Sequence, residues 1–233
     1  MIKAVIFDID GTLYSYVEND KIAVKKLCEY AEKILKIEEA EFRKVYKEAR
    51  RIVKEERLTD GGARHSRVLF FQTTLELLGQ NPFCHVLEMY DIYWNNFLAN
   101  MKPFDGAAEF IEKLHRAGIK IALCTDMTAH IQYRKIKQLG LNHFIDFMVT
   151  SEETGLEKPA RIMFELALKK LNVKAAETAY FGDSPERDMA GAKKAGITPF
   201  LYTGEKIFEN KIVKCTEISS YAEIINSEKF FNP

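Results

Sequence analysis

Strand-like and helix-like patterns alternate over most of the chain, but one long internal stretch holds helix patterns alone. After Pro103, short apolar runs that suit strands, such as 119–124 and 178–182, alternate with amphipathic helix patterns. This alternation is typical of βαβ units and predicts a mostly parallel sheet. From about 18 to 100, by contrast, amphipathic helix patterns follow one another with no convincing strand. The two patterns together restrict the chain to an α/β core that carries a helical insert.

The insert interrupts the core close to its beginning, because one strand precedes it. Residues 2–7 form a short apolar run, partly β-branched, that suits a buried strand. We therefore expect core at 1–16, a helical cap at 17–101 and the remainder of the core at 102–233, which the length of 233 residues allows. The expected fold class is α/β: a doubly wound, mostly parallel sheet of Rossmann type with an inserted all-α helical bundle as its cap.

The charge balance argues against a chain built to bind nucleic acid or an anionic membrane. Lys and Arg together number 34, as do Asp and Glu, so the formal net charge is zero, whereas such chains are usually basic. No run approaches the roughly 18 apolar residues of a transmembrane helix, and Met1–Ile9 lacks the long apolar centre of a signal peptide. The four cysteines form no CxxC pair. We expect free thiols and a cytoplasmic protein.

Four groups of polar residues follow expected strands of the core. They are Asp8-Ile9-Asp10-Gly11-Thr12, Thr125-Asp126, Lys158-Pro159 and Gly182-Asp183-Ser184, the last with Asp188 shortly after it. The carboxyl ends of parallel strands meet at one edge of a sheet, and open α/β sheets bind their ligands there. We therefore expect these side chains to converge on one site.

The chemistry of this set favours phosphoryl transfer. Several carboxylates at one point repel and need a cation, and ligands that are all oxygen suit Mg²⁺. A bound magnesium ion would attract a phosphate, for which Thr125 and Lys158 offer a hydroxyl donor and a positive charge. A carboxylate can then act as the nucleophile and form an aspartyl-phosphate. The sequence has no Gly-x-x-x-x-Gly-Lys-Ser/Thr loop, which argues against a P-loop enzyme.

In this order, the four motifs resemble those of the haloacid dehalogenase superfamily of phosphohydrolases, in the branch with a helical cap inserted after the first motif. The resemblance covers essentially the whole core. It implies that Asp8 is the nucleophile and a magnesium ligand. It also implies that Asp10 protonates the leaving group, then activates water, and gives its main-chain carbonyl to the metal. The family's dehalogenases lack an acid at the position of Asp10, so phosphate chemistry is favoured over carbon–halogen cleavage.

The remaining motif residues receive their roles from the same resemblance. Thr125, Asp126 and Lys158 are assigned to the transferring phosphoryl group, although many relatives carry Asn or another small polar residue at the position of Asp126. Asp183 is expected to bind magnesium directly. Ser184 and Asp188 are expected to support the site, Asp188 through water or hydrogen bonds.

The expected cap offers weaker signals. A polar break at Gly61-Gly62 precedes Arg64, His65 and Arg67, which are candidates for selecting an anionic or hydroxylated leaving group. A solvated start of a helix is an equally good interpretation of these three residues. The basic residues of the preceding helix, Lys47, Arg50, Arg51 and Lys54, are offset by nearby glutamates, and we expect them on a solvated face.

The function that fits best is a magnesium-dependent phosphatase that hydrolyses a small phosphorylated metabolite through an aspartyl-phosphate. A phosphomutase of a sugar phosphate remains open, because it uses the same four motifs and returns the phosphoryl group to a substrate hydroxyl. A phospho-receiver or binding module also uses an acidic cluster with Thr and Lys, but the large insert and the motif at 183–188 argue against it. The sequence carries no signal for an oligomeric state.

Overall fold

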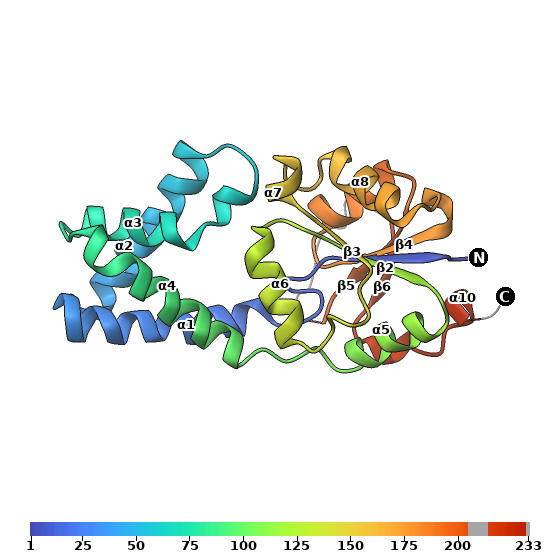
Figure 1. Ribbon diagram of the computed structural model, residues 1–233, viewed down its shortest axis with the longest axis horizontal. Coiled ribbons are helices and arrows are strands. Elements are labelled where there is room, and N and C mark those ends of the chain that lie inside the picture. The colour runs from blue at the N-terminus through green and yellow to red at the C-terminus, as the bar shows by residue number, and fades with distance from the viewer. Residues whose placement is uncertain (205–213, 232–233) are drawn as a thin grey trace.

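A six-stranded sheet, all of it parallel, forms the core of the computed structural model, which describes residues 1–204 and 214–231 (Figure 1). The strand order is β3-β2-β1-β4-β5-β6. The strands span Ala4–Phe7 (β1), Lys120–Thr125 (β2), Phe147–Thr150 (β3), Thr178–Gly182 (β4), Thr198–Tyr202 (β5) and Thr216–Ile218 (β6). This order reverses direction beside β1, where doubly wound sheets open a crevice at their carboxyl edge. The expected fold class is confirmed.

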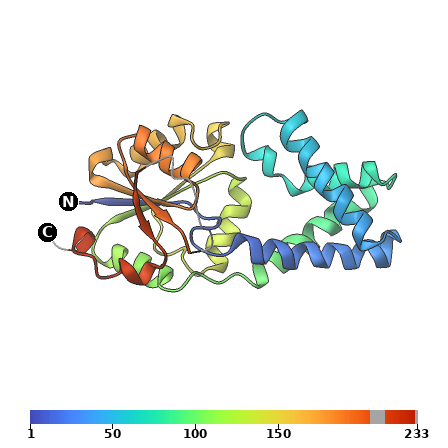
Figure 2. The ribbon, with the colours of Figure 1, turned by 180° about the vertical axis from the view of Figure 1, so that it is seen from behind.

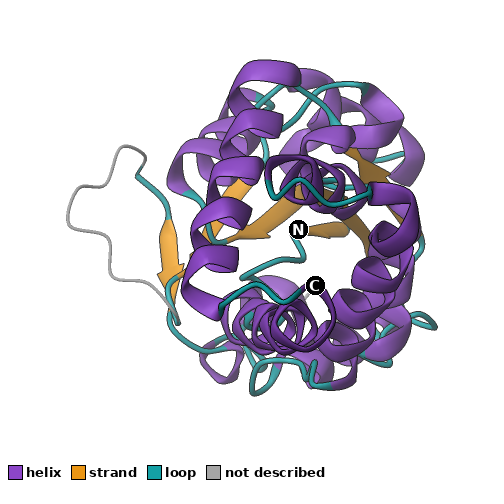
Figure 3. Cartoon of the chain, turned by 90° about the vertical axis from the view of Figure 1, so that its left-hand side faces the viewer, coloured by secondary structure: helices purple, strands orange, loops and turns teal. Residues whose placement is uncertain are grey.

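Helices cover both faces of the sheet, because apolar side chains alternate along its buried strands (Figure 3). In β1, Ala4 and Ile6 join one apolar cluster, whereas Val5 and Phe7 join the other. The first face is covered by α8 (Arg161–Leu171) and α9 (Ala190–Lys194). The second is covered by α5 (Ala107–Arg116), α6 (Ala129–Gln138) and α10 (Glu228–Phe231). Shorter elements are α7 (Ser151–Thr154), a π-helical turn at Pro185–Met189 and 3-10 turns at Ala175–Glu177 and Tyr221–Glu223.

Four helices form a bundle beside the carboxyl edge of the sheet, where Figures 1 and 2 show them from opposite sides. They are α1 (Tyr16–Tyr30), α2 (Glu39–Arg51), α3 (Arg67–Leu77) and α4 (Pro82–Ala99), with π-helical turns at Ala31–Leu35 and Ile52–Arg57 and a 3-10 turn at Gly62–His65. Side-chain oxygens of Ser15, Ser66 and Asn81 accept N–H groups at three of the helix starts. Buried rings, among them Trp94 and Phe97, fill the bundle.

The bundle leaves the core after β1 and returns before α5. The two connections lie side by side, because the N–H of Phe104 donates a hydrogen bond of 2.9 Å to the carbonyl oxygen of Leu13. One apolar cluster continues from the α5 face of the sheet into the bundle. No helix in the described part of the chain combines the length and the apolar character needed to cross a bilayer.

The structure differs from the sequence-based expectation in some elements. The π-helical turn at Pro185–Met189 precedes α9 without a break, and β6 is a short edge strand that no alternation signal marks. Ile34 and Leu87, apolar residues of the helical stretch expected from about 18 to 100, are 48% and 69% exposed. The apolar faces of the π-helical turn at Ala31–Leu35 and of α4 are therefore narrower than the sequence suggests.

Candidate active site

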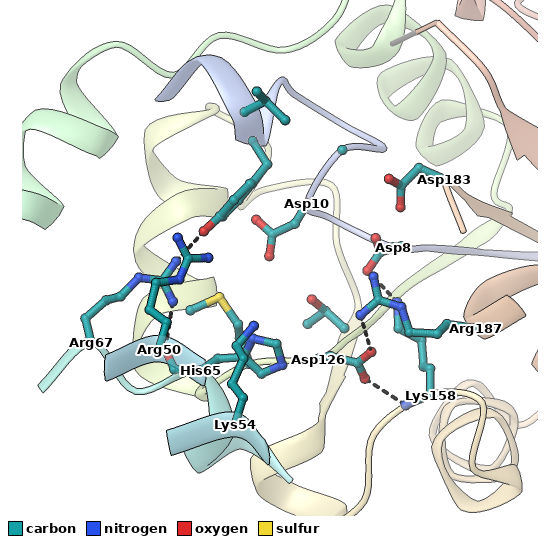
Figure 4. A pocket seen from close by; sticks show the side chains of 15 residues that line it. Asp8, Asp10, Arg50, Lys54, His65, Arg67, Asp126, Lys158, Asp183 and Arg187 are labelled. Atoms are coloured by element: carbon teal, nitrogen blue, oxygen red, sulfur yellow. Dashed lines mark hydrogen bonds and ion pairs between the residues drawn. The ribbon is translucent and has the colours of Figure 1, made fainter. Parts of the chain in front are cut away.

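A cavity of about 210 Å³ lies where the carboxyl ends of the strands face the helical bundle. Figure 4 shows core carboxylates at one end of it and basic bundle side chains at the other, with Asp10 between them. The predicted site residues that line the cavity are Asp8, Asp10, Thr125, Asp126, Lys158, Asp183, His65 and Arg67. Three predicted residues, Ser184, Asp188 and Arg64, are absent from this lining. The sheet thus brings the motifs together at one edge.

Asp8 follows β1 directly and is held by the neighbouring strand. Its N–H donates a hydrogen bond of 2.8 Å to the carbonyl oxygen of Phe181 in β4. The chain then turns at Gly11, whose φ is +83° and where a Cβ would lie 2.6 Å from Oδ2 of Asp183. Only glycine fits this turn without strain or displacement of Asp183. The local sequence therefore sets Asp8 and Asp183 beside each other.

Lys158 lies between two buried carboxylates. Its Nζ is 2.6 Å from Oδ1 of Asp8 and 2.7 Å from Oδ1 of Asp188. Burial raises the pKa of Asp8 and the ammonium of Lys158 opposes the rise; with repulsion by Asp188 and Asp183, the pKa is about 8. Lys158 therefore offsets part of the negative charge that the strand ends bring together.

The carboxylates of Asp8, Asp183 and Asp188 could hold a metal ion. One oxygen from each lies within 4.8 Å of the others, and all three residues are buried. Donor sets made only of oxygen suit hard cations such as Mg²⁺, and a cation would relieve the repulsion among these charges. Asp188, expected only to support the site, belongs to this group, whereas the carboxylate of Asp10 points to other partners.

Asp10 is held by side chains that belong to none of the four motifs. Nζ of Lys135 lies 2.5 Å from Oδ1 of Asp10, and the Gln132 amide donates to Oδ2 at 3.0 Å and to Thr125 Oγ1 at 2.5 Å. The Tyr14 hydroxyl also donates to Asp10. Burial opposes ionisation, but Lys135 and these hydrogen bonds outweigh it and lower the pKa of Asp10. The only sequence signal was the spacing of Gln132 and Lys135, which places both on one side of a helix.

Asp126 and Ser184 stabilise loops around the site. Oδ1 of Asp126 accepts the main-chain N–H of Lys158 at 2.8 Å, and Arg187 Nη1 lies 3.7 Å from Oδ2. Ser184 donates its N–H to Asp188 Oδ2 at 3.0 Å and accepts the N–H of Arg187 at 3.3 Å. Asp126, predicted to bind phosphate, thus lines the cavity and also fixes the loop that carries Lys158.

The three predicted bundle residues have different surroundings. Arg64 and His65 both pair with Glu157 of the core, at 2.6 and 2.7 Å. Burial lowers the pKa of His65, although its hydrogen bond with Glu157 opposes this. Arg67 is buried and lines the cavity. Of the three, His65 and Arg67 therefore face the space where a substrate would lie, and Arg64 joins the bundle to the core.

Two further cations reach the cavity from the basic helix that the sequence analysis assigned to solvent. Arg50 and Lys54 line it, whereas Lys47 and Arg51 are exposed as expected. The expectation of a solvated face is therefore wrong for Arg50 and Lys54. Their spacing of four residues puts them on one side of a helix, but the sequence does not show which side faces the core.

Taken together, a Rossmann-type sheet, a group of carboxylates at its strand ends and a helical bundle over them define an enzyme-like α/β core with an inserted helical cap. Residues 2–196 match the haloacid dehalogenase-like hydrolase family. The chain belongs to this family, and the expected resemblance is confirmed.

Named relatives of the chain are phosphatases. The ribulose-1,5-bisphosphate 5-phosphatase of Halopiger xanaduensis is 38% identical over 205 residues, which cover 87% of this chain and 85% of that protein. The glyceraldehyde 3-phosphate phosphatase of Methanopyrus kandleri is 33% identical over 203 residues, 84% of this chain and 82% of that protein.

Solved structures agree in fold. A 2-haloacid dehalogenase from Pseudomonas syringae superposes with a TM-score of 0.77 at 21% identity and covers 96% of both chains. A phosphatase of this superfamily from Thermococcus onnurineus gives a TM-score of 0.71 at 21% identity, over 95% of both chains. At this identity the similarity establishes the architecture only.

Proposed function

We propose that the protein is a magnesium-dependent phosphatase that hydrolyses a small phosphomonoester through an aspartyl-phosphate on Asp8. Its class, a phosphoric monoester hydrolase, rests on the family match and on relatives named as phosphatases. The observation that carries the mechanism is the position of Asp8 in the cavity, with Lys158 and Asp183 around it. Relatives above 30% identity are hydrolases by name, which favours water over a sugar hydroxyl as the final acceptor.

The metal fits the residues present. Asp8, Asp183 and Asp188 would hold it, because their oxygens are close together, buried and of the kind that Mg²⁺ prefers. When bound, the ion would supply positive charge to the phosphate oxygens.

In the first half-reaction a carboxylate oxygen of Asp8 attacks the phosphorus atom, and the bond from phosphorus to the leaving oxygen breaks. Lys158 and Thr125 stabilise the transferring group by charge and hydrogen bonding, the kind of preorganised stabilisation on which phosphoryl transfer depends. Asp10 gives the leaving oxygen a proton. The products of this step are the free alcohol and the aspartyl-phosphate.

In the second half-reaction Asp10 accepts a proton from water, whose oxygen attacks phosphorus and displaces Asp8. Inorganic phosphate leaves, and Asp8 is regenerated. Asp10 has a lowered pKa beside Lys135, so it is ready as a base. An incoming phosphate dianion would raise this pKa by repulsion and thereby favour the proton that Asp10 needs as an acid.

The helical bundle serves as the cap. We propose residues 17–101 as the cap and 1–16 with 102–233 as the core, since the chain leaves and re-enters the core at adjacent points. A cap above the cavity excludes bulk water during the transfer and selects the leaving group. The four free cysteines suit the reducing cytoplasm in which we expect the enzyme to act.

The test is phosphate release from a panel of phosphomonoesters in the presence of Mg²⁺. The names of the relatives put ribulose 1,5-bisphosphate and glyceraldehyde 3-phosphate first in the panel. We expect turnover by the wild type, none with EDTA, and a loss of about 1,000-fold or more in Asp8→Asn. The matched control is Asp91→Asn, which changes an exposed acid of α4. Wild-type turnover by Asp8→Asn would contradict the mechanism.

A further inference from the structure

We propose that the cap end of the cavity is a second phosphate site, so that the preferred substrates are short bisphosphates with one phosphate at Asp8 and the other at Arg50, Lys54 and Arg67. The inference rests on the proposed function for the phosphate that reacts. It goes further by choosing between the two kinds of substrate in the relatives' names, a bisphosphate and a monophosphate.

The first observation concerns the buried guanidinium of Arg67. Its side chain is 3% exposed and lines the cavity, yet its hydrogen bonds reach only neutral groups in the described structure. Nη1 donates to the His65 carbonyl oxygen at 2.9 Å, and Nη2 donates to the hydroxyls of Tyr93, at 3.1 Å, and Tyr16. Nε is buried without a hydrogen-bond partner. A buried guanidinium with an unused donor is costly unless an anion completes it.

The second observation concerns the ammonium of Lys54. It lines the same cavity, and within the described residues its ammonium contacts the Phe70 ring, 5.9 Å from Nζ, and forms no ion pair. Burial and the positive charges of Arg50 and Arg67 together lower its pKa to about 8. An ammonium that other cations repel gains most from an anionic ligand placed among them.

The charges around this end of the cavity do not balance. The cations are Arg50, Lys54, Arg64 and Arg67, and the carboxylates that pair with them or act on them electrostatically are Asp20 and Glu157. Asp20 lies 3.7 Å from Arg50, and Glu157 pairs with Arg64. The excess of two positive charges matches a phosphate, which carries a charge close to −2 at neutral pH.

The position of the cationic group defines the class of substrate. Figure 4 shows Arg50, Lys54 and Arg67 across the cavity from Asp8 and Asp183. The volume of about 210 Å³ is below the usual range of roughly 300–1,000 Å³ for drug-sized ligands. A molecule that reaches both ends must therefore be small and anionic at both, as a short-chain sugar bisphosphate is.

Binding to Asp8→Asn tests the second site without turnover. We would titrate this variant calorimetrically, with Mg²⁺ present, with ribulose 1,5-bisphosphate and with ribulose 5-phosphate, which has the same carbon chain and one phosphate less. We expect the bisphosphate to bind at least tenfold more tightly. When either Lys54→Met or Arg50→Met is combined with Asp8→Asn, the preference for the bisphosphate should fall at least threefold. Equal affinities for the two compounds would overturn the proposal.

Matched controls separate the site from general effects of charge. Lys47→Met and Arg51→Met remove exposed cations of the same segment that do not line the cavity, and the preference should persist in both. An equal loss in a control and in its cavity-lining counterpart would count against the site. 3-Phosphoglycerate, a three-carbon compound with one phosphate and one carboxylate, should bind more weakly than the bisphosphate, and equal binding would refute a phosphate site. Absence of hydrolysis by the wild type would instead contradict the proposed function.

Discussion

Lys54 is held in the cavity by the fold rather than by a partner of opposite charge. The groups that act on it electrostatically come from several elements: Arg50, Arg67, Glu157 and Arg64. Of these, only Glu157 favours the charged form, and it is already paired with Arg64 and His65. The ammonium therefore titrates near neutral pH, unlike an exposed lysine.

This titration predicts a pH dependence of substrate selection. Lys54 is charged below its pKa of about 8 and neutral above it, whereas a phosphate with its second pKa near 6 stays dianionic throughout. The KM for ribulose 1,5-bisphosphate, divided by that for ribulose 5-phosphate, should rise as the pH increases from about 7 to 9. Steady-state kinetics measures the ratio, in which effects on the shared chemistry cancel. In Lys54→Met the ratio should not change with pH, and a rise equal to that of the wild type would contradict the assignment.

At the scale of single residues, the sequence predicted the positions of site residues at strand ends better than those of site residues on helices. Asp8 and Asp183 could be placed together because both follow buried parallel strands, and register fixes where such strands end. Lys135 and Arg50 could not be placed in the same way. Each lies on an amphipathic helix, and only the packing of that helix decides whether a lysine or arginine faces solvent or the site.

At the scale of elements, the contact between the 3-10 turn Gly62–His65 and the loop before Lys158 connects cap and core. Glu157 pairs with Arg64 and His65, and its N–H donates to Asp60 Oδ1 at 2.6 Å. The carboxylate is 11% exposed, so these contacts are better shielded than a surface ion pair. Since Lys158 is the next residue, the same contact holds the helical bundle against the loop that carries Lys158.

Glu157→Gln should loosen this contact without touching Asp8. The loss of negative charge weakens the ion pair with Arg64 and the hydrogen bond with His65, so the cap should open more often. We expect faster amide hydrogen exchange over 60–66 and a severalfold lower kcat/KM. Glu165→Gln is the matched control, because it breaks an exposed pair with Arg161. Unchanged exchange together with unchanged kcat/KM would show that the contact does not hold the cap.

The type of element was predicted correctly where a hydrophobic pattern is long or where a strand is buried on both faces. The limits of the strand at 178–182 match β4, and the run at 119–124 lies one residue before β2. β6 was missed because a strand of three residues, with Thr216 and Glu217 exposed, has no apolar run to mark it. The motif order predicted the family from the core alone, and the family match confirms it.

At the scale of the whole molecule, a neutral chain divides its charges between the two ends of one cavity. The core supplies four carboxylates of the lining together with Lys158 and Arg187, whereas the cap supplies Arg50, Lys54 and Arg67 and, within the described part of the chain, no carboxylate. The formal net charge of zero conceals this separation. Because the cavity has walls from both parts, neither part alone would recognise a substrate with a phosphate at each end.

The central claim is that Asp8 carries the phosphoryl group during turnover. The direct measurement is acid quenching of the wild-type enzyme during steady-state hydrolysis with Mg²⁺, followed by proteolysis and peptide mass spectrometry. The account predicts a peptide heavier by one phosphoryl group, with the group on Asp8, and no such peptide from Asp8→Asn. A phosphoryl group on another residue, with Asp8 unmodified while hydrolysis proceeds, would contradict it.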